Sequence, residues 1–355
     1  MISKPIDKNK YFESLDIPNK DNYDWTVDGV KRMNNENIII LFSGVNKNDN
    51  SDFINGRAVN LKIYNDDTYL RMIKILSFII SLKNQIYFAN SSVLLSKNQE
   101  FLFVYNKGNN IPLNYLIFSN KTNYLENKDL IKWIVYQITY GLYILHSNNI
   151  IHHDIKTSNI LINEEGNICI NGFESAIFKG EKSISFTLAY SSPELLINLE
   201  ADEKIDLWDL GILMLELFCK KHKILENEEI NNRDKCIRYI LSFFGCNEKF
   251  SNQELKDMLK ENKNIEFKLN KEIEEKIWDK DALDFIKNLL VFNPNKRYSA
   301  KKALESNYLK EFKDIDSLNI KPLKYPIEYK TISKSTIDKN KFIELVNTMI
   351  KNKNI

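Results

Sequence analysis

Glycine and cysteine are scarce in this sequence, and neither is spaced as a metal-binding or phosphate-binding motif requires. The chain has four cysteines in 355 residues and no CxxC pair. Three of the four lie in or beside apolar stretches, where a cysteine is more often a small core residue than a metal ligand. The ten glycines include no Gly-x-Gly, and a loop without glycines brings its backbone amides less closely to a phosphate. We therefore expect neither a cysteine metal site nor a glycine-rich phosphate loop.

The sequence also lacks an excess of charge and a long apolar run. Fifty basic residues balance forty-eight acidic ones, for a formal net charge of +2, which gives no electrostatic reason for a nucleic-acid or membrane partner. The longest apolar stretch, 72–82, is interrupted by Lys74 and is too short to span a bilayer. The first ten residues carry no apolar secretory segment. We expect a cytoplasmic or nuclear protein with reduced thiols.

The first third of the chain has the pattern of a small sheet. Residues 1–36 are polar without a clear period and are expected to form an N-terminal extension. Strand-like runs follow at 37–42, 57–64, 92–95 and 100–105. Asn55-Gly56 precedes the second run and predicts a hairpin, and the last two runs predict another. Apolar positions at helical spacing over 67–82 predict one helix, which completes a small domain at 37–106.

The rest of the chain has mainly helical periodicity. A long apolar stripe over 128–146 predicts a buried helix. Further helices are expected at 206–219, 233–244, 281–292 and 299–306. These segments form a second, helical domain at 107–312, followed by a tail at 313–355. Within the tail, residues 335–350 predict an amphipathic helix, which is more often docked on its own domain than used as a partner site.

The most informative segment is 150–173, IIHHDIKTSNILINEEGNICINGF. It resembles the catalytic and metal-binding loops of eukaryotic protein kinases, H-R-D-x-K-x-x-N followed by D-F-G. The matching residues are His152, Asp154, Lys156 and Asn159, and His153 stands in place of the arginine.

Three other stretches arrive in the order that this resemblance requires. TLAYSSPELL (187–196), KIDLWDLGILMLEL (204–217) and FNPNKRYSAKKAL (292–304) are similar to the end of a kinase activation segment, to the D-x-W-x-x-G helix and to the last kinase motif. The TLxY form and RYILSFFGCN (238–247) are similar to the cyclin-dependent and MAP-kinase branch. The resemblance covers roughly 37–312. It implies a two-lobed α+β fold, with a five-stranded sheet and one helix in the small lobe and a mainly helical large lobe.

The resemblance assigns catalytic roles to three residues of the loop. Asp154 would accept or orient the proton of a substrate hydroxyl, and Lys156 would hold the γ-phosphate. Asn159 would offer an amide oxygen to a second Mg²⁺. The alternative is that these polar residues serve only the hydrogen bonds of the loop itself.

Other residues are structural by the same resemblance. Glu194 and Arg297 would form a buried ion pair, and Asp206 would anchor the backbone of the catalytic loop. Thr187 would form a hydrogen bond near Asp154, and His152 would support the loop.

The metal position departs from the family pattern. The aspartate of D-F-G is Asn171 here, in Asn171-Gly172-Phe173. Hard divalent cations prefer anionic oxygens, whereas an amide oxygen carries no net charge. One charge at metal distance is worth about 4 kcal/mol at an effective dielectric constant of 20, which corresponds to orders of magnitude in rate. Glu174 lies close in sequence and could substitute for the missing carboxylate.

The nucleotide-binding residues depart from the pattern as well. The strand lysine of V-A-I-K falls at Lys62, for which the alternative is an ordinary solvated lysine. Asn60 stands where the family has a small alanine against adenine, and its larger side chain would intrude on the ring. The glutamate that pairs with this lysine falls at Met72, which cannot form an ion pair.

Control by phosphorylation is expected to be absent. The arginine that grips an activation-segment phosphate is replaced by His153. The phosphorylated threonine of cyclin-dependent relatives lies five residues before the TLxY threonine, and that position is Lys182. Ser183 and Ser185 lie nearby.

These losses favour a pseudokinase that acts as a scaffold or allosteric partner of other proteins, with no required cofactor. The rival interpretation is an active or weakly active serine/threonine kinase that uses ATP and Mg²⁺ on a protein substrate. A third is a nucleotide sensor that binds ATP without turnover.

Overall fold

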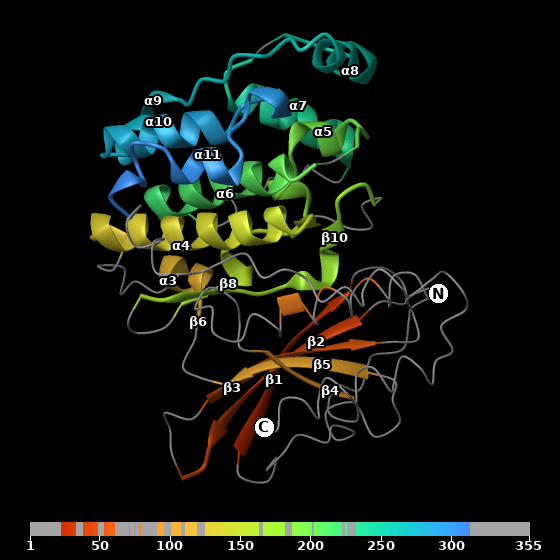
Figure 1. The fold of residues 1–355 in the computed structure, drawn as a ribbon, viewed down its shortest axis with the longest axis vertical. Helices are drawn as coiled ribbons and strands as arrows, with labels where there is room; N and C mark the ends of the chain where they lie inside the picture. The colour runs from red at the N-terminus through yellow and green to blue at the C-terminus, as the bar shows by residue number, and fades with distance from the viewer. Residues whose placement is uncertain are drawn as a thin grey trace. The chain divides into compact units, whose positions relative to one another are not determined.

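The computed structural model consists of two compact units (Figure 1). The described residues are 23–32, 38–48, 53–60, 71, 75, 78–79, 91–95, 101–107, 111–118, 125–162, 166–181, 187–200, 202–221, 224–225, 232–246 and 248–312. Those up to residue 107 belong to the first unit and those from residue 111 to the second. The predicted tail helix at 335–350 lies outside the described residues.

The first unit is built on a five-stranded antiparallel sheet in the order β1-β2-β3-β5-β4. The strands are β1 (Tyr23–Arg32), β2 (Ile38–Asn46), β3 (Phe53–Asn60), β4 (Ser91–Leu95) and β5 (Phe101–Lys107). β2 and β5 are rich in β-branched and aromatic residues, which favour extended structure. The sheet has the strand number that the resemblance implied, and the predicted β4–β5 hairpin is confirmed, with Val93 opposite Val104.

The edge strand β1 corrects the prediction for residues 1–36. This segment was expected to be an extension, yet Tyr23–Arg32 pairs antiparallel with β2, from Tyr23 opposite Asn46 to Arg32 opposite Ile38. The register shifts between Thr26 and Gly29, and a bulge of this kind interrupts the two-residue alternation by which a strand is recognised.

The predicted hairpin turn at Asn55-Gly56 is wrong. These residues lie inside β3, where Gly56 is opposite Phe42 on one side and Tyr105 on the other. The turn preference of Asn-Gly is local, and pairing with two neighbouring strands overrides it.

One helix contributes four buried positions to the first unit. Arg71, Ile75, Phe78 and Ile79 are helical and buried. Their spacing of four, seven and eight residues places them on one helical face, as predicted for 67–82.

The second unit is mainly helical. Its helices are α3 (Leu113–Phe118), α4 (Lys128–Ser147), α5 (Pro193–Leu196), α6 (Lys204–Cys219), α7 (Arg233–Phe243), α8 (Asn252–Lys260), α9 (Lys271–Lys276), α10 (Lys280–Leu289) and α11 (Ala300–Leu304). The short strands are β6 (Ile111–Pro112), β7 (Ile150–Ile151), β8 (Ile160–Ile162), β9 (Ile168–Ile170) and β10 (Ile177–Phe178). The predictions of α4, α6, α7, α10 and α11 are confirmed to within a few residues at their ends.

The helix α6 lies at the centre of this unit. Every residue from Ile205 to Phe218 is buried, as expected for a helix that is apolar on nearly all sides. It packs against α4 and α10, which Figure 1 shows beside it. At Gly211 an added Cβ would lie 2.7 Å from a side-chain carbon of Leu290, so glycine permits the close approach of α6 to the end of α10. Within the described ranges, no helix combines the length and apolar composition needed to cross a bilayer.

Candidate functional site

The segment that resembles a catalytic loop connects β7 to β8. Its two ends are fixed by strand pairing, since β7 pairs with β10 and β8 pairs with β9. Residues 152–157 are all buried, and a 3-10 turn at Thr157–Asn159 leads into β8. Local pairing therefore holds this polar loop against the helical core.

Asp206 of α6 holds the beginning of the loop. Its two carboxylate oxygens accept hydrogen bonds from the backbone N–H groups of His152 and His153, each at 2.8 Å. His153 has a φ of 68°, a left-handed conformation that costs free energy in a residue other than glycine. The ring Nε2 of His146 lies 2.8 Å from Asp206 Oδ2. Burial tends to raise the pKa of Asp206, but the bonds and charge of the histidines keep its pKa below the ordinary value.

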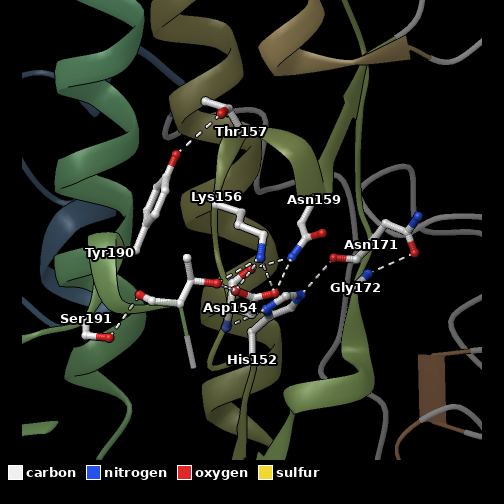
Figure 2. Close-up of polar contacts among 10 residues, drawn as sticks. His152, Asp154, Lys156, Thr157, Asn159, Asn171, Gly172, Tyr190 and Ser191 are labelled. Atoms are coloured by element: carbon white, nitrogen blue, oxygen red, sulfur yellow. Dashed lines mark hydrogen bonds and ion pairs between the residues drawn. The ribbon is translucent and has the colours of Figure 1, made fainter. Parts of the chain in front are cut away.

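The carboxylate of Asp154 receives four hydrogen bonds from three neighbouring side chains (Figure 2). Lys156 Nζ donates to both oxygens at 2.7 Å. The hydroxyl of Thr187 donates to Oδ1 at 2.7 Å, and Asn159 Nδ2 donates to Oδ2 at 2.9 Å. Two carboxylate oxygens offer about four lone-pair sites, so the hydrogen-bonding capacity of this carboxylate is filled.

This arrangement determines what the cluster can do. Asp154 can accept the proton of a hydroxyl group only after one of its present donors leaves. Lys156 is the donor that an anion such as a phosphate would attract, because its ammonium carries a full charge, and its departure would free a site on both oxygens. Lys156 Nζ also lies 2.9 Å from the Thr187 hydroxyl, so a move of Lys156 would also change the surroundings of Thr187.

Asn171 lies beside the cluster, and its polar atoms are used locally. Its side-chain oxygen accepts the N–H of Gly172 at 2.8 Å, and its carbonyl accepts the ring N–H of His152 at 3.0 Å. Its N–H donates to the carbonyl of Asn159 at 2.8 Å. Gly172 has a φ of +89°, and an added Cβ would lie 2.6 Å from the Asn159 side chain. The two asparagines are therefore brought together by a glycine that no other residue replaces easily.

These residues do not fit a Mg²⁺ ion well. Magnesium in proteins is held through carboxylates and phosphates, and the side-chain oxygens available at Asn159 and Asn171 are uncharged. The one nearby carboxylate, Asp154, is neutralised by Lys156 at 2.7 Å. Among the described residues there is no group of three or more His, Cys, Asp or Glu residues that could hold a metal.

A buried polar network, which sequence reasoning missed, connects the loop to the 187–190 segment. The hydroxyl of Tyr190 donates to Glu216 Oε2 at 2.5 Å, and the hydroxyl of Thr157 donates to the same oxygen at 2.9 Å. Burial, followed by the charge of Glu216, raises the pKa of Tyr190 well above its ordinary value. The available signal was Glu216 itself, because a carboxylate inside an apolar helix needs a buried partner.

Glu194 and Arg297 form a bidentate ion pair in the interior. Arg297 Nη1 and Nη2 donate to the two oxygens of Glu194 at 2.8 and 3.0 Å. The remaining N–H groups donate to the carbonyls of Val291 and Lys204, at 2.9 to 3.2 Å. All five guanidinium donors are thereby used, and this pair ties α5 to the chain between α10 and α11.

Several residues singled out in the sequence lie outside the described residues. They are Lys62, Met72, Lys182, Ser183 and Ser185. Their assignments therefore remain predictions.

The comparisons with known proteins agree with these motifs. The protein kinase domain family matches residues 57–309. Cyclin-dependent kinase 12 of Caenorhabditis elegans is 30% identical over 211 residues, which are 56% of this chain and 28% of the relative. Mitogen-activated protein kinase pmk-1 of C. elegans is 28% identical over 53% of this chain and 51% of the relative. Mitogen-activated protein kinase sty1 of Schizosaccharomyces pombe is 29% identical over 52% of this chain and 54% of the relative. The chain thus spans about half the length, or less, of these curated relatives.

Proposed function

The chain belongs to the protein kinase domain family, and on that premise we propose that it is a catalytically impaired member, a pseudokinase that acts as a scaffold or allosteric partner in intracellular signalling. The observation that carries the proposal is Asn171 at the metal position. Its side-chain oxygen is uncharged and already accepts the N–H of Gly172. The loss of one charge at metal distance is worth about 4 kcal/mol at an effective dielectric constant of 20, or about a thousandfold in rate.

The selective nature of the losses supports this proposal. The residues that hold the fold are in place, including the Glu194–Arg297 pair and Asp206. The residues expected to hold ligand differ, since Asn171 replaces a carboxylate and Met72 replaces the partner of Lys62. A kinase domain that keeps its shape without its metal site still presents large surfaces to a protein partner.

We also propose that the protein is not switched by activation-segment phosphorylation. His153 takes the place of the arginine that would grip a phosphate, and Lys182 takes the place of the threonine that would carry it. Phosphopeptide mapping tests this directly. A phosphate on Ser183 or Ser185 that is required for activity would contradict it.

The second candidate is an active or weakly active serine/threonine kinase, in which case the family implies ATP and Mg²⁺. The observation that favours it is the assembled cluster of Asp154, Lys156, Asn159 and Thr187, with side-chain bonds of 2.7 to 2.9 Å. Asp154 would then act as the acceptor of the substrate proton and Lys156 as the phosphate ligand, with Lys62 holding the nucleotide.

A thermal-shift experiment with ATP, with and without Mg²⁺, separates the two candidates. The pseudokinase proposal predicts no Mg²⁺-dependent rise in melting temperature for the native chain. Asn171→Asp should gain one, because it restores the anionic oxygen and keeps an acceptor for Gly172. Asn307→Asp adds the same charge at an exposed position and serves as the control.

Phosphotransfer to a peptide gives the second readout. The proposal is wrong if the native protein shows substantial transfer that Asp154→Ala abolishes. A Mg²⁺-dependent shift that Lys62→Ala removes would favour the enzyme. A shift with nucleotide but without transfer would favour the nucleotide sensor.

A further inference from the structure

A second carboxyl on α6 lies beside the catalytic loop, and none of the roles assigned above uses it. Asp209 follows Asp206 by three residues, so both side chains lie on one face of the helix. Only 5% of Asp209 is exposed. It accepts a hydrogen bond from the backbone N–H of Ile155. Asp206 and Asp209 therefore hold the backbone on either side of Asp154.

The charges around Asp209 are unfavourable for a third carboxylate. Asp206, on its own helix, and Asp154, on the loop, both act on it with negative charge. Arg297 acts on it as a cation more weakly, and its donors are already bonded to Glu194 and backbone carbonyls. Lys156 is bonded to Asp154 and His146 to Asp206.

Burial and these like charges act on Asp209 in the same direction. Burial raises its pKa well above the ordinary 3.8, the charges of Asp206 and Asp154 raise it further, and the Ile155 N–H and Arg297 only partly offset them. The folded chain therefore retains this proton at a pH where the unfolded chain has lost it. The stabilisation from the proton is complete below a pH of about 4 and decreases as the pH rises toward the pKa of the folded state.

We propose that Asp209 is a positioning residue that holds the catalytic loop in its uncharged form, and that its ionisation loosens the loop around Asp154. A neutral carboxyl keeps the bond to Ile155 and adds no charge beside Asp154 and Asp206. An ionised one would place a third negative charge in the same buried region. The inference rests on the catalytic-loop assignment in the proposed function, but it does not depend on whether phosphotransfer occurs.

The test compares the native chain with Asp209→Asn across pH. Asparagine has nearly the shape of the protonated acid and keeps the acceptor for Ile155, but it does not titrate. We expect the unfolding constant of the native chain, relative to the variant, to rise about tenfold per pH unit between pH 5 and 7. Asp281→Asn, at an exposed position on α10, removes a carboxylate of the same kind and should show no such slope.

Amide hydrogen exchange at residues 152–156 reads the loop itself. Native and Asp209→Asn chains should show similar protection at pH 5, and the native loop should exchange faster as the pH rises. Comparison at equal pH cancels the intrinsic pH dependence of exchange. Asp209→Ser, which also cannot titrate, serves as a second variant if the asparagine chain folds poorly.

The outcomes are distinct. A stability ratio independent of pH, or an asparagine variant that is less stable by the same factor at every pH, would overturn the proposal, because Asp209 would then be ionised and stabilising. Because both readouts are made without nucleotide or substrate, their failure is separate from a failure of the pseudokinase proposal.

Discussion

Replacement of Arg297 by methionine should remove a large part of the stability of the second unit. The Arg297 side chain is fully buried, its partner Glu194 is 2% exposed, and its five donors bond to one carboxylate and two carbonyls. Methionine keeps most of the apolar stem but leaves Glu194 charged, buried and without its cation.

The magnitude follows from the cost of an uncompensated buried charge. Breaking a buried ion pair by removal of one partner costs about 3–5 kcal/mol, compared with a total of about 5–15 kcal/mol for a typical protein. At roughly 2–4 °C per kcal/mol for a chain of this size, the melting temperature should fall by roughly 6–20 °C. Chemical denaturation followed by circular dichroism measures the same loss.

Two further variants isolate the cause. Arg297→Met combined with Glu194→Leu should recover much of the loss, because replacing a whole buried pair by apolar residues is often nearly neutral. Lys276→Met breaks an exposed pair with Glu272 at 3.0 Å and should leave the midpoint unchanged. A loss below about 1 kcal/mol for Arg297→Met, or a double variant no more stable than the single one, would refute the reasoning.

Two other predictions concern the loop and the thiols. Gly172→Ala should destabilise the native state by more than 1 kcal/mol, because φ is +89° and the new Cβ would lie 2.6 Å from Asn159; a melting temperature equal to that of the native chain would contradict this. Burial raises the pKa of the Cys236 thiol to about 12 and of Cys169 to about 11, so both should stay unmodified by a thiol reagent at pH 8 until denaturant is added, as peptide mass spectrometry would show; rapid labelling of either in the folded protein would contradict it.

The elements that sequence predicted well are those whose signal is contained in one segment. The helices α4 and α6 have enough apolar periodicity or continuous apolarity to be recognised alone. β1 was missed because its pairing with β2 decides its structure, and Asn55-Gly56 was misjudged because a local turn preference was weighed without the two strands beside β3. Both errors concern contacts between segments distant in sequence.

The candidate site divides in the same way. Asp154, Lys156 and Asn159 were found because they lie within six residues and match one motif. Glu216 and Asp209 were missed, because inside an apolar helix nothing in the sequence indicates which distant residue a carboxyl will meet. Tyr190 and Ile155 meet them only after α6 is packed in the core.

The burial of α6 on every side separates the shape of the loop from any reaction it performs. The loop takes its form from Asp206, which belongs to the interior, and no ligand is needed to impose that form. Substitutions at positions facing α6 are therefore limited by unfolding, whereas those at Asn171 and its neighbours are limited only by chemistry. A chain built in this way can exchange one occupation for another while its architecture stays the same.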